Sequence, residues 1–131
     1  MSQLMEMAGL PSDQVTTVAV VRVSGRSSGL PAVLDAARTE GASAVARAGL
    51  GLAWIRLAPA EPPALVASVE RLRAALAPAP CVVLDAPEGV RAALDPWDEP
   101  AEGPHAALMR RVKARFDPAG TCNPGRYAAG I

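Results

Sequence analysis

The chain has 131 residues, of which 50% are hydrophobic and 20% are charged, so its composition is that of one folded domain and not of a disordered segment. Thirteen basic residues balance thirteen acidic ones, which argues against nucleic acid or a membrane surface as the main partner. No apolar run reaches the ~18 residues needed to cross a bilayer, and the start of the chain lacks a secretion signal. We therefore expect a cytoplasmic protein without membrane insertion.

The cysteines and the single histidine do not form a recognisable reactive site. Cys81 lies in the apolar run CVVLD, which is typical of a buried thiol, and Cys122 lies in a polar tail without an assigned base. His105 opens a predicted helix, and there is neither a second histidine nor a cluster of carboxylates beside it. The sequence predicts no metal site.

The first half of the chain alternates between strand and helix patterns. Residues 1–15 form a lead-in without sustained periodicity, and the β-branched run 16–24 predicts a strand. A helix follows, with Pro31 in its first turn and Gly41 at its end. Its apolar stripe consists of Leu30, Val33, Leu34 and Ala37.

Two further strands, 42–49 and 50–58, are predicted to form a hairpin across Gly49 and Gly51, because glycine permits the positive φ that a tight turn needs. A second helix carries Leu65, Val69, Leu72 and Leu76 at helical spacing, and the apolar run 80–86 is a fourth strand. The order β-α-β-β-α-β over residues 16–86 predicts an α+β, ferredoxin-like sandwich. It would have a four-stranded antiparallel sheet with two helices on one face.

The remainder predicts a connector, a helix and an irregular tail. Residues 87–103 are rich in Pro, Gly and acid, with one helical turn around Val90 to Leu94. Residues 104–116 form a third helix that would dock by the stripe of His105, Met109, Val112 and Phe116. Its basic residues Arg110, Arg111, Lys113 and Arg115 form either a solvated face or a contact to a partner subunit or a cofactor phosphate.

Two turns fix the tail that follows this helix. Asp117-Pro118 ends the helix, because the residue before a proline is disfavoured in the α region. Asn123-Pro124-Gly125 is a turn signature that holds Asn123 and Arg126 in defined positions. From the residues alone, the tail is either a staple over its own domain or a segment that contacts another one.

The closing sequence resembles the carboxyl end of FAD-linked oxidases of the vanillyl-alcohol-oxidase type. Their chains commonly finish with the pattern K-x-x-F-D-P-x-G-x-x-N-P-G-[RK]. The matching positions here are Lys113, Phe116, Asp117, Pro118, Gly120, Asn123, Pro124, Gly125 and Arg126. Within that superfamily the ending is most similar to E subunits of bacterial glycolate oxidases. Those subunits usually have Trp-Gly in place of Trp97-Asp98, and Gly-Gly-Ile in place of residues 129–131.

The resemblance implies a function for the intact enzyme. FAD would be its cofactor, a 2-hydroxy acid such as glycolate its substrate, and other subunits, including an iron-sulfur subunit, its partners. Residues 104–131 would return to an FAD-binding domain that this chain does not contain, so we expect no FAD binding or activity by the chain alone. By resemblance Asn123 and Arg126 would contact the cofactor, while the catalytic base remains unassigned.

Three strand arginines, Arg22, Arg47 and Arg56, are candidates for binding the substrate carboxylate, although each also suits an exposed strand position. A rival hypothesis is a stand-alone ferredoxin-like module that binds a small molecule or assembles subunits without catalysis. A third is a fragment with no function beyond folding.

Overall fold

The computed structural model of this chain describes residues 17–99, 102–128 and 131. The predicted lead-in, residues 1–15, lies outside these residues. The elements, in chain order, are β1 (Val20–Ser24), η1 (Ser27–Gly29), α2 (Leu30–Thr39), β2 (Ser43–Arg47), η2 (Ala48–Leu50), β3 (Leu52–Arg56), α3 (Pro62–Leu76), β4 (Cys81–Asp85), α4 (Glu88–Ala93) and α5 (Pro104–Phe116). The predicted strand 16–24 is therefore shorter, since it begins at Val20.

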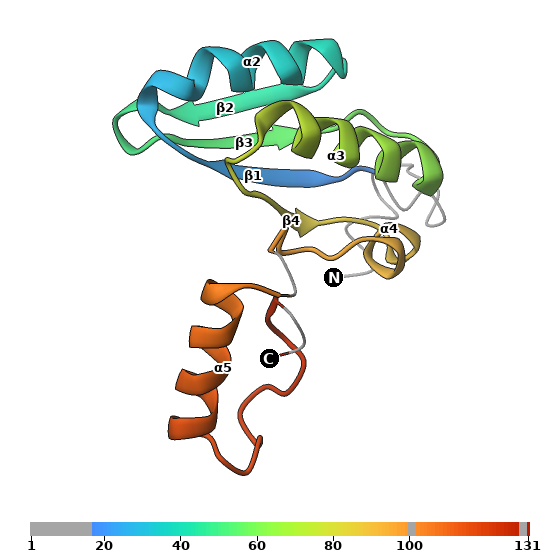
Figure 1. Cartoon of the computed structure of the whole chain (residues 1–131). Helices are drawn as coiled ribbons and strands as arrows, with labels where there is room; N and C mark the ends of the chain where they lie inside the picture. The colour runs from blue at the N-terminus through green and yellow to red at the C-terminus, as the bar shows by residue number, and fades with distance from the viewer. Residues whose placement is uncertain (1–16, 100–101, 129–130) are drawn as a thin grey trace, which may run out of the picture.

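The four strands form one antiparallel sheet in the order β2-β3-β1-β4. Each helix connection skips over a neighbouring strand: α2 leads from β1 to the edge strand β2, and α3 leads from β3 to the other edge, β4. Both helices lie on the same face of the sheet (Figure 1). This arrangement confirms the predicted α+β, ferredoxin-like sandwich. None of the helices among the described residues is long and apolar enough to cross a membrane.

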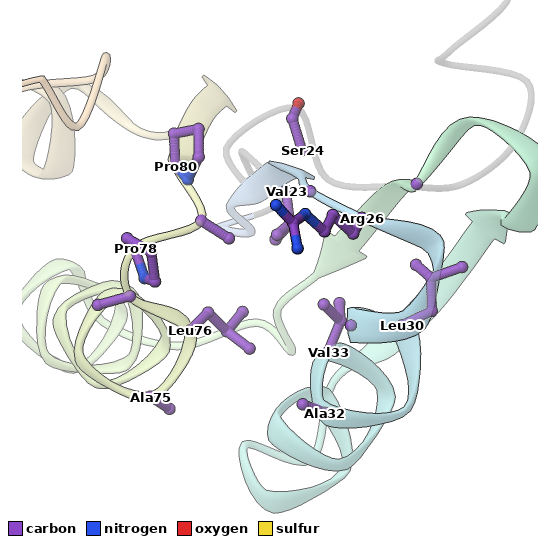
Figure 2. Close-up of a pocket in the computed structure, with 15 residues that line it drawn as sticks. Val23, Ser24, Arg26, Leu30, Ala32, Val33, Ala75, Leu76, Pro78 and Pro80 are labelled. Atoms are coloured by element: carbon purple, nitrogen blue, oxygen red, sulfur yellow. The ribbon is translucent and has the colours of Figure 1, made fainter.

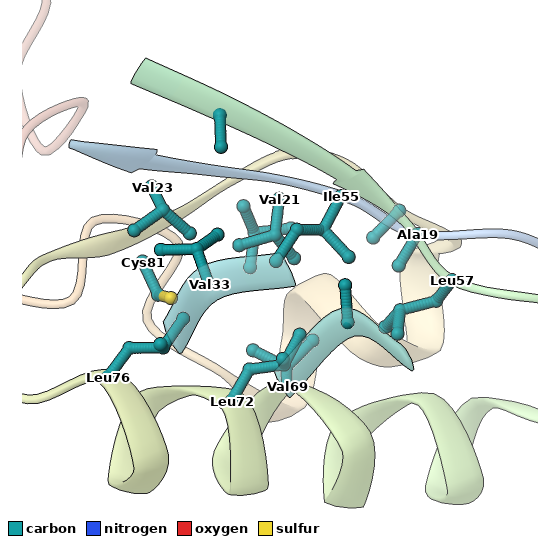
Figure 3. Packing of buried hydrophobic residues seen from close by; sticks show 14 of the residues in the cluster. Ala19, Val21, Val23, Val33, Ile55, Leu57, Val69, Leu72, Leu76 and Cys81 are labelled. Carbon is teal, nitrogen blue, oxygen red and sulfur yellow. The ribbon is translucent and has the colours of Figure 1, made fainter. Parts of the chain in front are cut away.

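The core lies between the sheet and the two helices. Alternate residues of β1, such as Val21 and Val23, are fully buried, and Ile55 of β3 lies beside them. These side chains point toward Val69 and Leu72 of α3 (Figure 3). Burying an aliphatic side chain of this size contributes roughly 1.5–3 kcal/mol, so this cluster is the main source of stability.

The apolar stripe of α2 is narrower than predicted. Leu30, Val33 and Ala37 are buried, but Leu34 remains 46% exposed. Leu34 lies about 100° around the helix from Val33, which places it at the border of the stripe rather than on the line that meets the sheet. Three of the four predicted contact residues are therefore correct, and Leu34 is not.

The β2–β3 connection contains the short η2 turn, and only one of its glycines needs glycine's conformational freedom. Gly51 has a φ of +63°, whereas Gly49 does not have a positive φ. The Gly51 carbonyl accepts a hydrogen bond of 2.9 Å from the Gly25 N–H, so two loops approach each other here. A Cβ built on Gly51 would lie 2.0 Å from the Gly25 carbonyl oxygen.

Replacing Gly51 by alanine is expected to lower the free energy of unfolding by about 2 kcal/mol or more, because strained φ and a backbone clash act together. Gly49→Ala is the matched control, since nothing lies within 4 Å of a Cβ at that position. Urea unfolding of both variants measures the difference. Equal stabilities would contradict the role assigned to Gly51.

The connector covers the free edge of β4. The Val83 N–H donates to the carbonyl of Pro96 at 2.7 Å, and the Cys81 N–H donates to the carboxylate of Asp98 at 2.8 Å. Arg73 of α3 lies 3.2 Å from the same carboxylate. These contacts close the edge of β4 to further strands, which protects it from pairing with other chains.

The predicted helical turn is present as α4, which precedes these connector residues in the chain, and its Val90 is fully buried.

Candidate functional site

The α5 helix has the predicted boundaries, but its predicted stripe does not dock. Phe116 is 83% exposed, Val112 is 45% exposed and His105 is also exposed, whereas Ala106 is the buried residue of the helix among those described. The helix extends away from the sheet beyond β4, so the core offers it no apolar surface (Figure 1). The prediction that α5 docks by this stripe was wrong for the described chain, and with Leu108 the helix presents an apolar face to solvent.

The tail is held to α5 by the carboxylate of Asp117. This group accepts hydrogen bonds from the N–H groups of Thr121 and Cys122, each at 2.9 Å, and from the Thr121 hydroxyl at 3.1 Å. The ammonium of Lys113 lies 2.6 Å from it and also donates to the Cys122 carbonyl. Lys113, and then these backbone donors, hold the pKa of Asp117 well below its ordinary value.

This arrangement corrects one detail of the sequence analysis. Lys113 does not belong to the solvated basic face with Arg111 and Arg115, because its side chain is only 26% exposed and faces the tail. Lysine and aspartate four residues apart on a helix are neighbours, so the motif positions Lys113 and Asp117 could have predicted the contact.

The contacts of the Asp117 carboxylate with Lys113, Thr121 and Cys122 are called the Asp117 clamp below. Two residues with left-handed backbone conformations shape the turn that follows it. Asn123 has a φ of +46° and Gly125 a φ of +69°, and the Arg126 N–H donates to the Asn123 carbonyl at 3.2 Å. Asparagine tolerates this conformation better than most residues, which is the reason for the predicted turn at Asn123-Pro124-Gly125. The turn therefore places Asn123 and Arg126 on one short segment.

Trp97 ties this segment to the connector. Its indole N–H donates to the Arg126 carbonyl at 3.2 Å, and its ring lies 4.9 Å from that of Tyr127. The tail consequently folds back along α5 and leaves a hollow of about 570 Å³ between them. Asn123 and Arg126 both line this hollow, and neither side chain has a hydrogen-bond partner among the described residues.

The three strand arginines lie on the sheet face opposite the helices. Arg22 alternates with the buried Val21 and Val23, and it pairs in register with Trp54, which pairs with Val45. By the same alternation Arg56 and Arg47 lie on this face, two residues from Trp54 and from Val45 respectively. The guanidinium of Arg47 lies 5.8 Å from the centre of the Trp54 ring.

Arg22 differs from the other two arginines in its surroundings. It is on a central strand and its Nε is buried without a hydrogen-bond partner among the described groups, whereas Arg47 and Arg56 are exposed. A buried donor without an acceptor costs free energy, and this nitrogen has almost no accessible surface. The sheet face thus combines an aromatic platform with three cations.

The two sets of predicted residues are not brought together. Asn123 and Arg126 line the hollow beside α5, and none of the three strand arginines lines it. Trp54, Trp97 and Asp98 take part in these arrangements but were not predicted. The sequence could have indicated the two tryptophans as candidate contact residues, because large aromatic side chains are rare in this chain.

The structure agrees with the prediction for Cys81. Cys81 is fully buried, and burial raises the pKa of its thiol to about 11, so it packs as a small hydrophobe. His105 lies 2.9 Å from the Glu99 carboxylate. No group of three metal-ligating side chains occurs within the ranges that the structure describes.

Replacing Asp117 by asparagine is expected to release the tail from α5, because the amide loses the ion pair with Lys113 and accepts fewer hydrogen bonds. In the parent chain the lowered pKa means that the clamp is complete above about pH 4 and is lost as the pH falls toward that lowered value. The amide chemical shifts of Thr121 and Cys122 should therefore change at a pH clearly below the ordinary carboxyl pKa of about 4.

Asp35→Asn is the control for this experiment, since Asp35 makes an exposed ion pair with Arg38 away from the tail. At every pH it should show the same Thr121 and Cys122 shifts as the parent chain, including the change at low pH. A transition at the ordinary carboxyl pKa, about 4, or parent-like shifts in Asp117→Asn, would contradict the clamp.

Comparison with known families gives one match. Residues 92–127 match the family described as FAD linked oxidases, C-terminal domain. The matched segment contains α5, the Asp117 clamp and the turn with Asn123 and Arg126. This supports assignment of the segment to the C-terminal part of an FAD-linked oxidase, whose intact form would use FAD. No curated protein and no solved structure matches the chain significantly.

Proposed function

We propose that this chain is the C-terminal cap and tail portion of an FAD-dependent 2-hydroxy-acid oxidase of the glycolate oxidase type. It would act together with an FAD-binding domain, either joined to it or carried by another chain. The observation that carries the proposal is the Asp117 clamp, which lies inside the matched segment and fixes a tail whose Asn123 and Arg126 side chains have no partner among the described residues.

The tail would form one side of the FAD-binding site. The Asn123 amide and the Arg126 guanidinium supply hydrogen-bond donors that are unpaired among the described residues and line the same hollow. When bound, FAD supplies the chemistry of accepting a hydride, one proton with two electrons, from the carbon that bears the substrate hydroxyl. The tail residues would bind and orient the cofactor, while the rest of its binding site would come from the FAD-binding domain.

The open sheet face would bind the substrate carboxylate in the assembled enzyme, where the FAD-binding domain would have to bring the flavin to this face. Arg22 is the first choice, because it lies on a central strand of the face and Trp54 beside it provides a flat apolar wall. Guanidinium groups bind carboxylates through two parallel hydrogen bonds, which fixes the orientation of a small acid. Arg47 and Arg56 at the rim would attract the anion and exclude neutral analogues.

The apolar face of α5 supports an assembly role. Leu108, Val112 and Phe116 are exposed large hydrophobic side chains on one short helix, and Arg111 and Arg115 are exposed beside them. Such a surface is typical of an interface. We propose that it binds the FAD-binding domain, and that electrons leave the assembled enzyme through an iron-sulfur subunit.

Reconstitution tests the proposal. The chain is co-expressed with two partners in turn, the product of any adjacent reading frame that encodes an FAD-binding domain and the FAD-binding domain of a glycolate oxidase E subunit, and the product is purified through a tag on this chain. We expect a yellow complex that oxidises glycolate or a similar 2-hydroxy acid with a dye as electron acceptor. A colourless chain that purifies alone in both pairings would contradict the proposal.

A second candidate function is an anion-binding or assembly module without redox chemistry. The cluster of three arginines around Trp54 favours it, because such a face can bind a carboxylate without any cofactor. In that case the chain alone should bind glycolate, and adding the FAD-binding domain should change neither this affinity nor the purification behaviour.

A further inference from the structure

A second hollow, also of about 570 Å³, lies on the helical side of the sheet. It opens between the first turn of α2 and the last turn of α3, and Val23 at the end of β1 forms its floor. Leu30 and Val33 line one side and Leu76 lines the other (Figure 2). Its volume lies within the range of small-molecule sites, about 300–1,000 Å³. None of the residues in the proposed function lines it.

This hollow exists because small residues stand where the two helices diverge. Ala32 and Ala75 lie on the facing sides, and a Cβ on Gly29 would meet nothing within 4 Å. The rim is fixed, since the Gly25 N–H is bonded to the Gly51 carbonyl and Gly51 fits against it without room for a side chain. The cavity is therefore preformed, which lowers the cost of filling it.

Arg26 provides a positive charge at the mouth of this apolar hollow. Arg26 is the charged residue among the described residues that line the hollow, and its side chain extends across the space toward Leu76 and Pro78 (Figure 2). It is exposed and has neither an ion pair nor a side-chain hydrogen bond among the described groups. The start of α2 beside it adds partial positive charge, and no carboxylate of the described residues lines the site to oppose an anion.

We propose that this hollow binds a small monocarboxylate with an apolar chain. The chain would lie between Val33 and Leu76, and the carboxylate would pair with the guanidinium of Arg26 at the mouth. A single cation matches a single negative charge, so a monoanion leaves no charge uncompensated, in contrast to a phosphate ester. The site is separate from the sheet face that the proposed function assigns to a 2-hydroxy acid.

The test uses the isotope-labelled full chain, titrated with sodium octanoate and separately with 1-octanol, and amide shifts as the readout. We expect octanoate to shift the amides of Gly25, Gly29 and Ala77, and 1-octanol to bind about tenfold more weakly, as the loss of one charge-assisted hydrogen bond implies. Arg26→Gln should bind octanoate about tenfold more weakly and no longer prefer it to 1-octanol. Arg91→Gln, an exposed arginine on α4, is the matched control and should bind like the parent.

A second variant fills the hollow without removing charge. Ala75 is exposed on α3, so Ala75→Leu should fold normally, which a thermal melt checks, while losing the binding of both probes. The proposal is overturned by equal affinity for octanoate and 1-octanol, by parent-like binding in Arg26→Gln or Ala75→Leu, or by the absence of binding. It is also overturned by shifts confined to the sheet arginines or to α5, which would place the ligand elsewhere. These outcomes do not depend on FAD or on a partner domain.

Discussion

Replacing Leu72 by alanine is expected to lower the free energy of unfolding by about 3 kcal/mol, within the range of about 2–5 kcal/mol for buried leucines. Leu72 is 1% exposed and packs from α3 against the sheet, so the substitution leaves a cavity that rigid strands cannot close. Urea unfolding followed by circular dichroism measures the loss. Because domains of this size have only about 5–15 kcal/mol of stability, the effect would be a large share of the total.

Leu34→Ala on α2 is the matched control for this variant. The residue type and the secondary structure are the same, but Leu34 is 46% exposed, so the loss should stay below about 1 kcal/mol. A loss at Leu34 as large as that at Leu72 would mean that a further surface covers α2 in solution.

The double variant Val112→Ser, Phe116→Ser is expected to leave the stability of the chain unchanged and to weaken its association with the FAD-binding domain by more than tenfold, which corresponds to about 1.4 kcal/mol. Phe116 is 83% exposed and Val112 is 45% exposed, and neither belongs to the core cluster, so their removal costs no core packing. At an interface, each would contribute roughly 1.5–3 kcal/mol by burial. Flavin absorbance that co-purifies with the tagged chain, together with a thermal melt, separates the two effects.

Leu50→Ser provides the control, since Leu50 is 63% exposed on the η2 turn, outside the helix. It should retain the yellow complex. If the double variant also retained it, α5 would not be the contact surface, although the assignment of the fold would stand.

The sheet and its two helices followed from the sequence because their signals are local. In β1 the apolar Val21 and Val23 alternate with Arg22, and this alternation predicts which face of the strand is buried. In α3 the buried face is predicted by four apolar residues at helical spacing: Leu65, Val69, Leu72 and Leu76. The ends of elements were less accurate: β1 begins at Val20 because pairing with β3, and not β propensity alone, decides where a strand starts.

The behaviour of α5 could not be predicted in this way. A stripe such as His105, Met109, Val112 and Phe116 indicates that a helix has an apolar side, but periodicity carries no information about what covers it. The tail was predicted in part. The turn at Asn123 follows from residue chemistry, whereas the inward direction of Lys113 depends on where the returning backbone places the carbonyl of Cys122.

Asp98 combines a left-handed backbone with a structural role. Its φ of +57° is a conformation that glycine adopts without strain. In this chain the aspartate carboxylate bonds the Cys81 N–H and pairs with Arg73, which offsets the backbone strain. The contact to the edge of β4 could not be read from the sequence, because it joins residues distant along the chain.

The hydrogen bond from Trp97 to the Arg126 carbonyl, together with the packing of Trp97 on Tyr127, closes the C-terminal segment into a loop at its base. Trp97 adjoins Asp98, which is itself fixed to the sheet. The turn that carries Asn123 and Arg126 is thus connected to the edge strand β4 through two adjacent residues of the connector. A substitution at Trp97 would therefore be felt at Arg126, although the two residues are far apart in the sequence.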